Sequence, residues 1–359
     1  MILNKKSIIA LIILCVVYLS YYIYKINIKN DLDNSLDIIL KSKVSKNLQN
    51  VNKYSEQKYN YLLALQLKRW DLAKETLEKL ADKKDPEATY WLAYTSGGNV
   101  FAGLSMFDLF RKSANLGDPY AALQLTEDGD YCTTYLKPYC DDSWYDKAKV
   151  IFEEKFNKGR ASLLDRFYYE IIFKGDYLSK DIADIIVSNM EVGEFAPLIK
   201  YTRYIVNNFD LSDDEKNKLK NILKIPNSRN YYPSLSLSYY SNELDFNKKN
   251  IVDKAFLSGD YCIICYVYFN DFKNRDNVIK NGINMIVGDT LKDSDKIMKT
   301  YKLKDLTFNN GMDFIDYYFK SNQYKNISES EKINIFKKSL EKLNSHKIDV
   351  YINQFNYGL

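Results

Sequence analysis

The clearest feature of the hydropathy pattern is an uncharged run of eighteen residues, Ser7 to Tyr24, directly after Lys5 and Lys6. As a helix with a rise of about 1.5 Å per residue, this run spans about 27 Å, close to the hydrocarbon thickness of a bilayer. Tyrosines gather at its C-terminal end, where an aromatic belt is expected: Tyr18, Tyr21, Tyr22 and Tyr24. The pattern predicts a transmembrane signal anchor over residues 1–25 that contacts the membrane through residues 7–24.

Local residues disfavour two alternatives to a retained anchor. Cleavage by signal peptidase needs small residues three and one positions before the cut, and here Tyr18 stands opposite Ser20. Lipid attachment at Cys15 needs a small residue before the cysteine, and Leu14 stands there. We favour retention, with cleavage and lipidation as the open alternatives.

A periodic pattern of apolar positions follows the anchor. Asp85-Pro86-Glu87-Ala88 recurs 33 residues later as Asp118-Pro119-Tyr120-Ala121. Apolar residues spaced by four precede each copy and predict one stripe along a helix: Ala73, Leu77 and Ala81 before the first, Met106, Phe110 and Ala114 before the second. In each Asp-Pro pair, Asp caps a new helix and Pro occupies its first turn. The unit is helix, tight turn, helix.

The same frame continues more weakly downstream. Further stripes lead into Gly159, Gly193 and Gly259, where a left-handed glycine can end a helix: Ala148, Phe152 and Phe156; Ile182, Ile186 and Met190; Val252 and Phe256. Residues 212–215 and 328–331 have the capping-box form that begins a helix. Tyr59 to Leu67 predicts a helix that covers the first repeat.

These segments resemble Sel-one-like repeats, relatives of tetratricopeptide repeats. The resemblance is clear over residues 70–175, is degenerate to about residue 270, and lacks the usual leucine-glycine pair, which Leu92-Ala93 and Leu125-Thr126 replace. It implies an all-α fold in which stacked helical hairpins form an α-solenoid. The alternative is a generic helical bundle. We expect a polar stalk at 26–54, helical repeats at 55–275 and degenerate C-terminal helices at 276–359.

Composition supports a helical body and disfavours nucleic-acid binding. The chain is 46% hydrophobic and 27% charged, and 13 Gly and 6 Pro are few for a turn-rich sheet protein. Its 51 basic and 47 acidic residues give a net charge of +4, without a basic stretch interleaved with aromatics. We therefore expect no nucleic-acid partner.

Cysteine spacing bears on the compartment, which charge does not settle because lysines flank the apolar run on both sides. Beyond Cys15, the cysteines form two close pairs, Cys132/Cys140 and Cys262/Cys265. Such pairing favours disulfides in an oxidising compartment. We predict a single-pass inner-membrane protein whose body faces the periplasm; four reduced, buried thiols in a cytosolic body are the alternative.

The insertion at residues 128–143 is the strongest candidate site. It lengthens the spacing from 33 to 42 residues and carries Cys132 and Cys140, acidic residues and clustered tyrosines. Aromatic residues dominate interface energies and charges steer encounters, so we expect a rigid projection that binds a basic protein partner. The expected contact residues are Tyr131, Asp141, Asp142, Trp144 and Tyr145, with Trp91 as a member that could instead be core. The alternative is a solvated loop that is cross-linked only for stability.

No set of residues indicates catalysis or a cofactor. His346 is the only histidine, which argues against a Ser-His-Asp triad and a His-based zinc site, and the ordered ligand series of a calcium loop is absent. Cys262-Ile263-Ile264-Cys265 has the spacing of a redox dithiol but lacks a strand-to-helix setting. We expect no enzyme activity, no cofactor, no metal and no small-molecule substrate.

Together these features indicate a membrane-anchored protein that acts by binding another protein. Anchored bacterial repeat proteins similar to this one include immunity proteins that neutralise secreted antibacterial toxins, lipase effectors among them. That resemblance implies occlusion of a toxin. The alternative is an envelope scaffold or regulatory adaptor.

Overall fold

The computed structural model describes residues 5–42, 54–66, 70–96, 103–228, 231–241, 243–247, 251, 328 and 350–354, and most of these residues are helical. No strand occurs in these ranges. The helices are α1 (Lys5–Lys41), α2 (Glu56–Gln66), α3 (Trp70–Asp82), α4 (Pro86–Thr95), α5 (Gly103–Asn115), α6 (Pro119–Gln124), α7 (Ser143–Asn157), α8 (Leu163–Tyr169), α9 (Lys180–Glu191), α10 (Ala196–Asn208), α11 (Asp213–Ser228) and α12 (Tyr232–Tyr240). Short π-helical turns η3 (Cys132–Leu136) and η5 (Glu170–Lys174) and the 3₁₀ turn η4 (Lys137–Tyr139) complete them.

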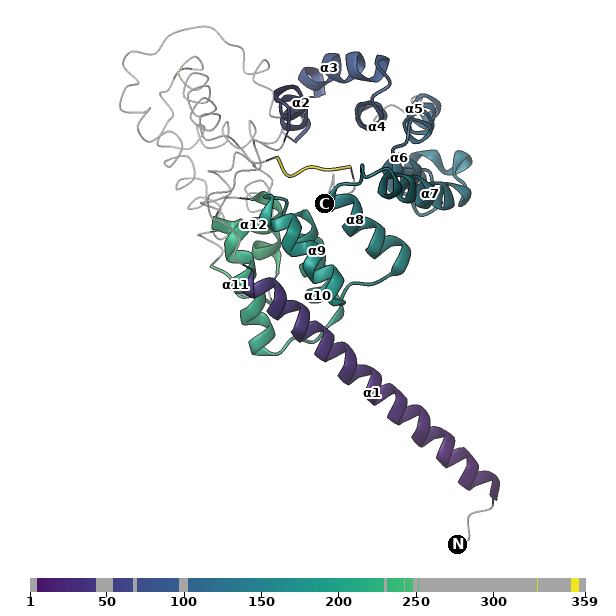
Figure 1. Cartoon of the computed structure of the whole chain (residues 1–359), viewed down its shortest axis with the longest axis vertical. Coiled ribbons are helices and arrows are strands. Elements are labelled where there is room, and N and C mark those ends of the chain that lie inside the picture. The colour runs from purple at the N-terminus through teal and green to yellow at the C-terminus, as the bar shows by residue number, and fades with distance from the viewer. Residues whose placement is uncertain are drawn as a thin grey trace.

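Helices α2 to α8 follow one another around an arc, each packed against its neighbour in sequence (Figure 1). The predicted stripes form the contact faces: Ala73, Leu77, Met106 and Phe110 are each at most 1% exposed. Full burial of such a leucine or phenylalanine is worth about 1.5–3 kcal/mol. The predicted helix before the first repeat is α2, which packs against α3.

The predicted helix caps within the described residues are confirmed, whereas Gly259 and residues 329–331 of the second capping box lie outside those residues. Asp85 and Asp118 accept hydrogen bonds from Ala88 N (2.8 Å) and Ala121 N (3.0 Å) at the first turns of α4 and α6. The Ser212–Glu215 capping box begins α11, with Ser212 N donating to Glu215 Oε2 at 2.7 Å. Glycines 117, 159 and 193 adopt the left-handed conformation after α5, α7 and α9, with φ of 99°, 63° and 79°. Local sequence therefore sets where these helices begin and end.

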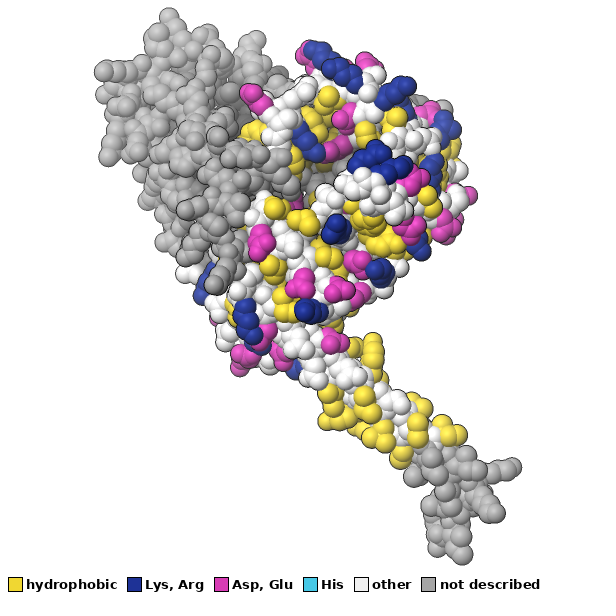
Figure 2. Space-filling view, in the orientation of Figure 1, with side chains coloured by type: hydrophobic (Ala, Val, Ile, Leu, Met, Phe, Trp, Pro, Cys, Tyr) yellow, Lys and Arg dark blue, Asp and Glu magenta, His cyan; other side chains and the backbone are white. Residues whose placement is uncertain are grey.

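Helix α1 joins two different environments (Figures 1 and 2). Its N-terminal part protrudes from the body, and apolar side chains from Ile13 to Ile26 are exposed around it. Among the described side chains, which in α1 start at Ile13, no helix is both long and apolar enough to cross a membrane. The first part of the predicted span, residues 7–12, lies outside the described side chains.

The C-terminal part of α1 belongs to the core, although residues 26–54 were expected to form a polar stalk. Residues 26–41 continue the helix, and Leu32, Leu36 and Ile39 are at most 2% exposed against α9 and α11. Polar contacts add to this seam: Ser35 Oγ lies 2.5 Å from Tyr201 OH, and Lys218 Nζ lies 3.3 Å from Asp33 and 2.9 Å from Asp37. The apolar positions of this segment, spaced by three and four, pack against the body, which holds the helix in place.

The described C-terminal segment is not helical. Residues 350–354, placed among the predicted C-terminal helices, run as an extended ribbon on the inner side of the arc (Figure 1). Val350 and Ile352 are 1% and 5% exposed, while Tyr351 between them is partly exposed. This alternation is typical of an extended chain with one buried face. These five residues fall in the range 276–359, where degenerate helices were expected, but they are not themselves helical.

Candidate functional site

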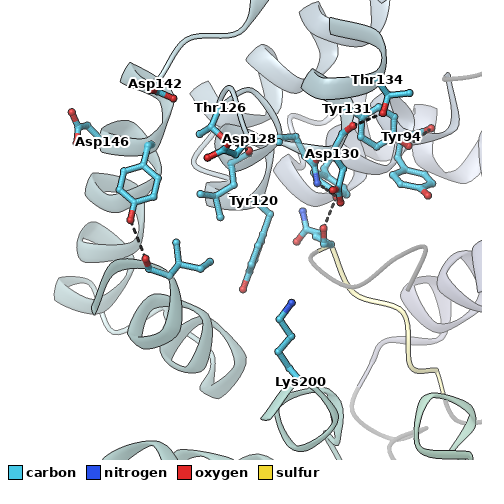
Figure 3. Close-up of a pocket in the computed structure, with 17 residues that line it drawn as sticks. Tyr94, Tyr120, Thr126, Asp128, Asp130, Tyr131, Thr134, Asp142, Asp146 and Lys200 are labelled. Carbon is cyan, nitrogen blue, oxygen red and sulfur yellow. Dashed lines mark hydrogen bonds between the residues drawn. The ribbon is translucent and has the colours of Figure 1, made fainter. Parts of the chain in front are cut away.

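A hollow of about 1100 Å³ lies on the inner side of the helical arc (Figure 3). The 128–145 segment, α4, α6, η5, α10 and the C-terminal segment all contribute to its wall. Its polar and aromatic lining comprises Tyr90, Tyr94, Tyr120, Tyr131 and Tyr145, the acids Asp128, Asp130, Asp142 and Asp146, and Lys200 and Gln354.

Contacts with neighbouring residues hold several of the tyrosines in place. The Tyr131 ring lies 5.2 Å from that of Tyr94 and 5.3 Å from that of Phe110. Tyr145 donates its hydroxyl to the Ile172 carbonyl at 2.9 Å. These partners restrict side-chain rotation, so the aromatic walls are ordered before any ligand binds.

Tyr120 is fixed by a buried ion pair behind the hollow. Its hydroxyl donates to Asp165 Oδ1 at 2.8 Å, and the other oxygen of Asp165 lies 2.7 Å from Lys155 Nζ. Burial, with the Asp165 carboxylate as the next cause, raises the pKa of Tyr120 well above its ordinary value. Tyr120 is therefore a neutral wall residue and not a proton donor at physiological pH.

The charges in the hollow are unevenly distributed. Among the described residues, four carboxylates line it together with one lysine: Asp128, Asp130, Asp142, Asp146 and Lys200. Lys200, on α10, points into the hollow from the side opposite the acids (Figure 3). Burial lowers the pKa of Lys200, and Arg203 acts in the same direction. Aromatic faces and carboxylates together suit a cationic group such as the side chain of lysine or arginine.

The C-terminal segment forms part of the wall through Gln354. Its side-chain nitrogen donates to Asp118 Oδ2, and its backbone carbonyl accepts from the Tyr90 hydroxyl. Asp118 is 4% exposed, and burial raises its pKa to about 7. Hydrogen bonds thus link Gln354 both to Asp118, the cap of α6, and to Tyr90 in the lining of the hollow.

The 128–143 insertion is compact and largely helical. Cys132 and Cys140 lie at disulfide distance, with Cα atoms 6.0 Å apart, at the start of η3 and just after η4. Gly129 precedes these turns, and a Cβ atom there would lie 2.6 Å from the Gln124 carbonyl oxygen. A side chain at residue 129 does not fit, because the insertion packs tightly against the end of α6.

The structure brings together half of the predicted contact residues. Tyr131, Asp142 and Tyr145 line the hollow. Asp141 is exposed and accepts a hydrogen bond from Ser143 N at 2.6 Å, but it is not part of the lining. Trp144 is partly buried, and Lys147 Nζ lies 4.6 Å from the centre of its ring.

Two further predictions have different outcomes. Trp91 is fully buried, with 0% exposure and a ring contact to Tyr90 at 5.2 Å, so it is a core residue and not a contact residue. Cys262 and Cys265 lie outside the described residues.

Sequence analysis missed Tyr90, Leu123, Lys200 and Gln354. A usable signal exists for two of them: Tyr90 and Leu123 stand 33 residues apart, at the same position of the repeat, and both face the hollow. Lys200 and Gln354 carry no such signal, because only tertiary packing brings them to the hollow.

Within the described residues, no group of three or more His, Cys, Asp or Glu side chains could hold a metal ion. Comparisons of the chain with profiles of known protein families, with curated proteins and with solved structures found no significant match. The resemblance to Sel-one-like repeats stays a prediction.

Proposed function

We propose that this protein is a membrane-anchored, non-catalytic α-solenoid of helical hairpins that binds another protein in the hollow. The observation that carries the proposal is the lining itself: five tyrosines and four carboxylates around about 1100 Å³. Aromatic side chains supply interface energy, and carboxylates attract and orient a cationic partner. The partner we expect presents lysine or arginine side chains.

The anchor rests on α1. Exposed apolar side chains surround this helix on all sides between Ile13 and Ile26, whereas a helix lying on a membrane surface carries them on one face. The tyrosines at the end of the run are expected to form an aromatic belt at the membrane surface. We also expect the body to face the periplasm, and Cys132 and Cys140, which lie at disulfide distance, support this expectation.

The specific function we propose is immunity to a secreted antibacterial toxin, with a membrane-active lipase effector as one candidate target. The inhibitor would cover the toxin's active-site entrance by inserting basic toxin residues into the hollow, burying on the order of 1,600 Å² in total. Tethering through α1 would keep the inhibitor where such a toxin meets its lipid.

Competition between sibling cells tests this proposal. A strain lacking the protein should grow normally alone and be killed in co-culture with toxin-secreting siblings. Restoring the wild-type chain should restore survival, whereas a chain carrying Asp142→Asn, Asp146→Asn and Tyr145→Ala should not. Asp82→Asn, at an exposed acid on α3 outside the hollow, is the matched control and should protect fully.

Two outcomes would contradict the proposal in different ways. A growth or shape defect in solitary culture would favour the envelope-scaffold alternative over immunity. Full protection by the triple variant, with the chain present at normal levels, would show that the hollow is not the contact surface.

A further inference from the structure

The C-terminal segment lies in the arc as a peptide ligand lies in a groove. Residues 350–354 contact side chains that are far away in sequence and belong to successive helical pairs. These contacts come from four of the pairs, in each case from the second helix or from the residue that precedes it: Tyr90 on α4, Asp118 before α6, Tyr168 on α8 and Tyr231 before α12.

The contacts include both backbone and side chains of the segment. Tyr90 donates to the carbonyl of Gln354, and the side-chain amide of Gln354 donates to Asp118. The Tyr168 hydroxyl lies 3.5 Å from Asn353 Oδ1, and the ring of Tyr351 lies 6.1 Å from that of Tyr231. Val350 and Ile352 are buried. The segment thus presents two buried aliphatic side chains spaced by two, followed by two amides that form hydrogen bonds.

We expect the free energy of docking residues 350–354 onto the helices to be small enough for the segment to dissociate. Only two aliphatic side chains are fully buried, and docking must order five residues of backbone. The side chains of these five residues are uncharged and include no cysteine, so the segment forms no side-chain ion pair and no disulfide. A contact of this size is weak on its own and persists because covalent attachment gives it a high effective concentration.

We propose that the surface formed by Tyr90, Asp118, Tyr168 and Tyr231 is a peptide-binding groove, occupied in cis by residues 350–354. The occupant it fits in trans is an extended segment of a protein partner with the same chemistry, aliphatic residues two apart followed by Asn or Gln. Gln354 also lines the hollow, so release of the segment opens the hollow on that side. The partner's role rests on the proposed function, whereas occupancy by the chain's own end does not.

The test supplies the native segment as a separate peptide. In the full chain, Val350→Asp with Ile352→Asp should expel the segment and leave the groove empty. A fluorescent peptide with the sequence of residues 348–359 should then bind this variant saturably in detergent micelles, by anisotropy. It should bind the wild-type chain at least tenfold more weakly, because the attached segment competes.

Two matched controls define the site. The same peptide carrying both Asp substitutions should not bind. Tyr90→Phe, added to the chain variant, should weaken binding severalfold because it removes one donor while keeping the ring. Absence of peptide binding to a variant with native circular dichroism would overturn the proposal.

Hydrogen exchange on the unmodified chain keeps the proposal testable if the variant does not fold. A dissociable segment should exchange its amides at 351–354 at least tenfold faster than the core amides of α4 and α9. Equal protection of the segment and these helices would show a permanent core element and overturn the proposal. Because no partner is added in either experiment, failure of the immunity proposal leaves both results unchanged.

Discussion

Burial of Asp118 brings the titration of its carboxyl group close to neutral pH. Asp118 caps α6 and accepts a hydrogen bond from the side chain of Gln354. It is 4% exposed, and burial raises its pKa from 3.8 to about 7. A carboxyl group with a raised pKa binds more protons in the folded than in the unfolded state. Its contribution to stability is therefore greatest at low pH and falls as the pH rises from about 4 to about 7.

Asp118→Asn should remove this pH dependence, since asparagine keeps the cap and stays uncharged. We expect the free energy of unfolding of the variant, relative to the wild-type chain, to rise between pH 5 and pH 8. Chemical unfolding followed by circular dichroism measures it. Asp141→Asn is the control, because hydrogen bonds from Ser143 hold the pKa of the exposed Asp141 below its ordinary 3.8. The difference in free energy of unfolding between this variant and the wild-type chain should therefore stay constant between pH 5 and pH 8. A flat difference for Asp118→Asn would contradict the assigned environment.

A second prediction at this scale concerns the stabilisation of the fold by a disulfide between Cys132 and Cys140. Closing so short a ring stabilises a fold by about 2–3 kcal/mol in the chain-entropy account. Adding reductant to the unmodified chain should therefore lower its free energy of unfolding by about that amount. The Cys132→Ser, Cys140→Ser variant should be insensitive to reductant, and an equal response in both chains would assign the effect to other cysteines.

At the scale of elements, the docking of α1 can be tested within a single helix. Leu36 is 0% exposed against the body, whereas Leu40, four residues on, is 37% exposed. Leu36→Ala should cost about 2–5 kcal/mol, the range for deleting a buried leucine side chain. Leu40→Ala should stay within about 0.5 kcal/mol, as exposed substitutions usually do. Equal losses in thermal or chemical unfolding would mean that α1 is not packed as described.

Sequence predicted the elements whose signals are local. Stripes spaced by four, Asp-Pro caps and left-handed glycines involve residues within one turn of each other, and the helices between Trp70 and Asn208 begin and end near them. The buried role of Trp91 was left open, because an aromatic residue on a helix has the same pattern whether it faces core or groove. The docked half of α1 was missed because its few apolar residues are surrounded by Asn, Asp and Lys.

The whole-molecule features were the least predictable. The hollow depends on Tyr90, Lys200 and Gln354, which are separated by more than a hundred residues from one to the next. Nothing in five residues such as Val350–Gln354 says which distant helices they will contact. Half of the predicted contact residues lie at the hollow because composition, aromatic and acidic, was enough to mark one wall of it.

Attachment to the membrane is the prediction that concerns the whole molecule. Arginine at the centre of a span costs about 2.5–3.5 kcal/mol. Val16→Arg with Leu19→Arg should therefore release the chain from membranes into the carbonate-soluble fraction. Val192→Arg replaces an equally apolar, 44% exposed residue on the body and should leave the chain in the pellet. Sedimentation of the double variant with membranes would contradict the anchor.

The continuity of α1 sets how the body is held. Leu32, the first residue of α1 that is buried against the body, follows Ile26 by six positions, a rise of about 9 Å along an unbroken helix. If the apolar half of α1 lies in a bilayer, as proposed, this short and continuous helix restricts rotation of the body and keeps it close to the membrane. The body would then stand at a fixed tilt close to the lipid headgroups, and any partner would have to reach it at the membrane surface.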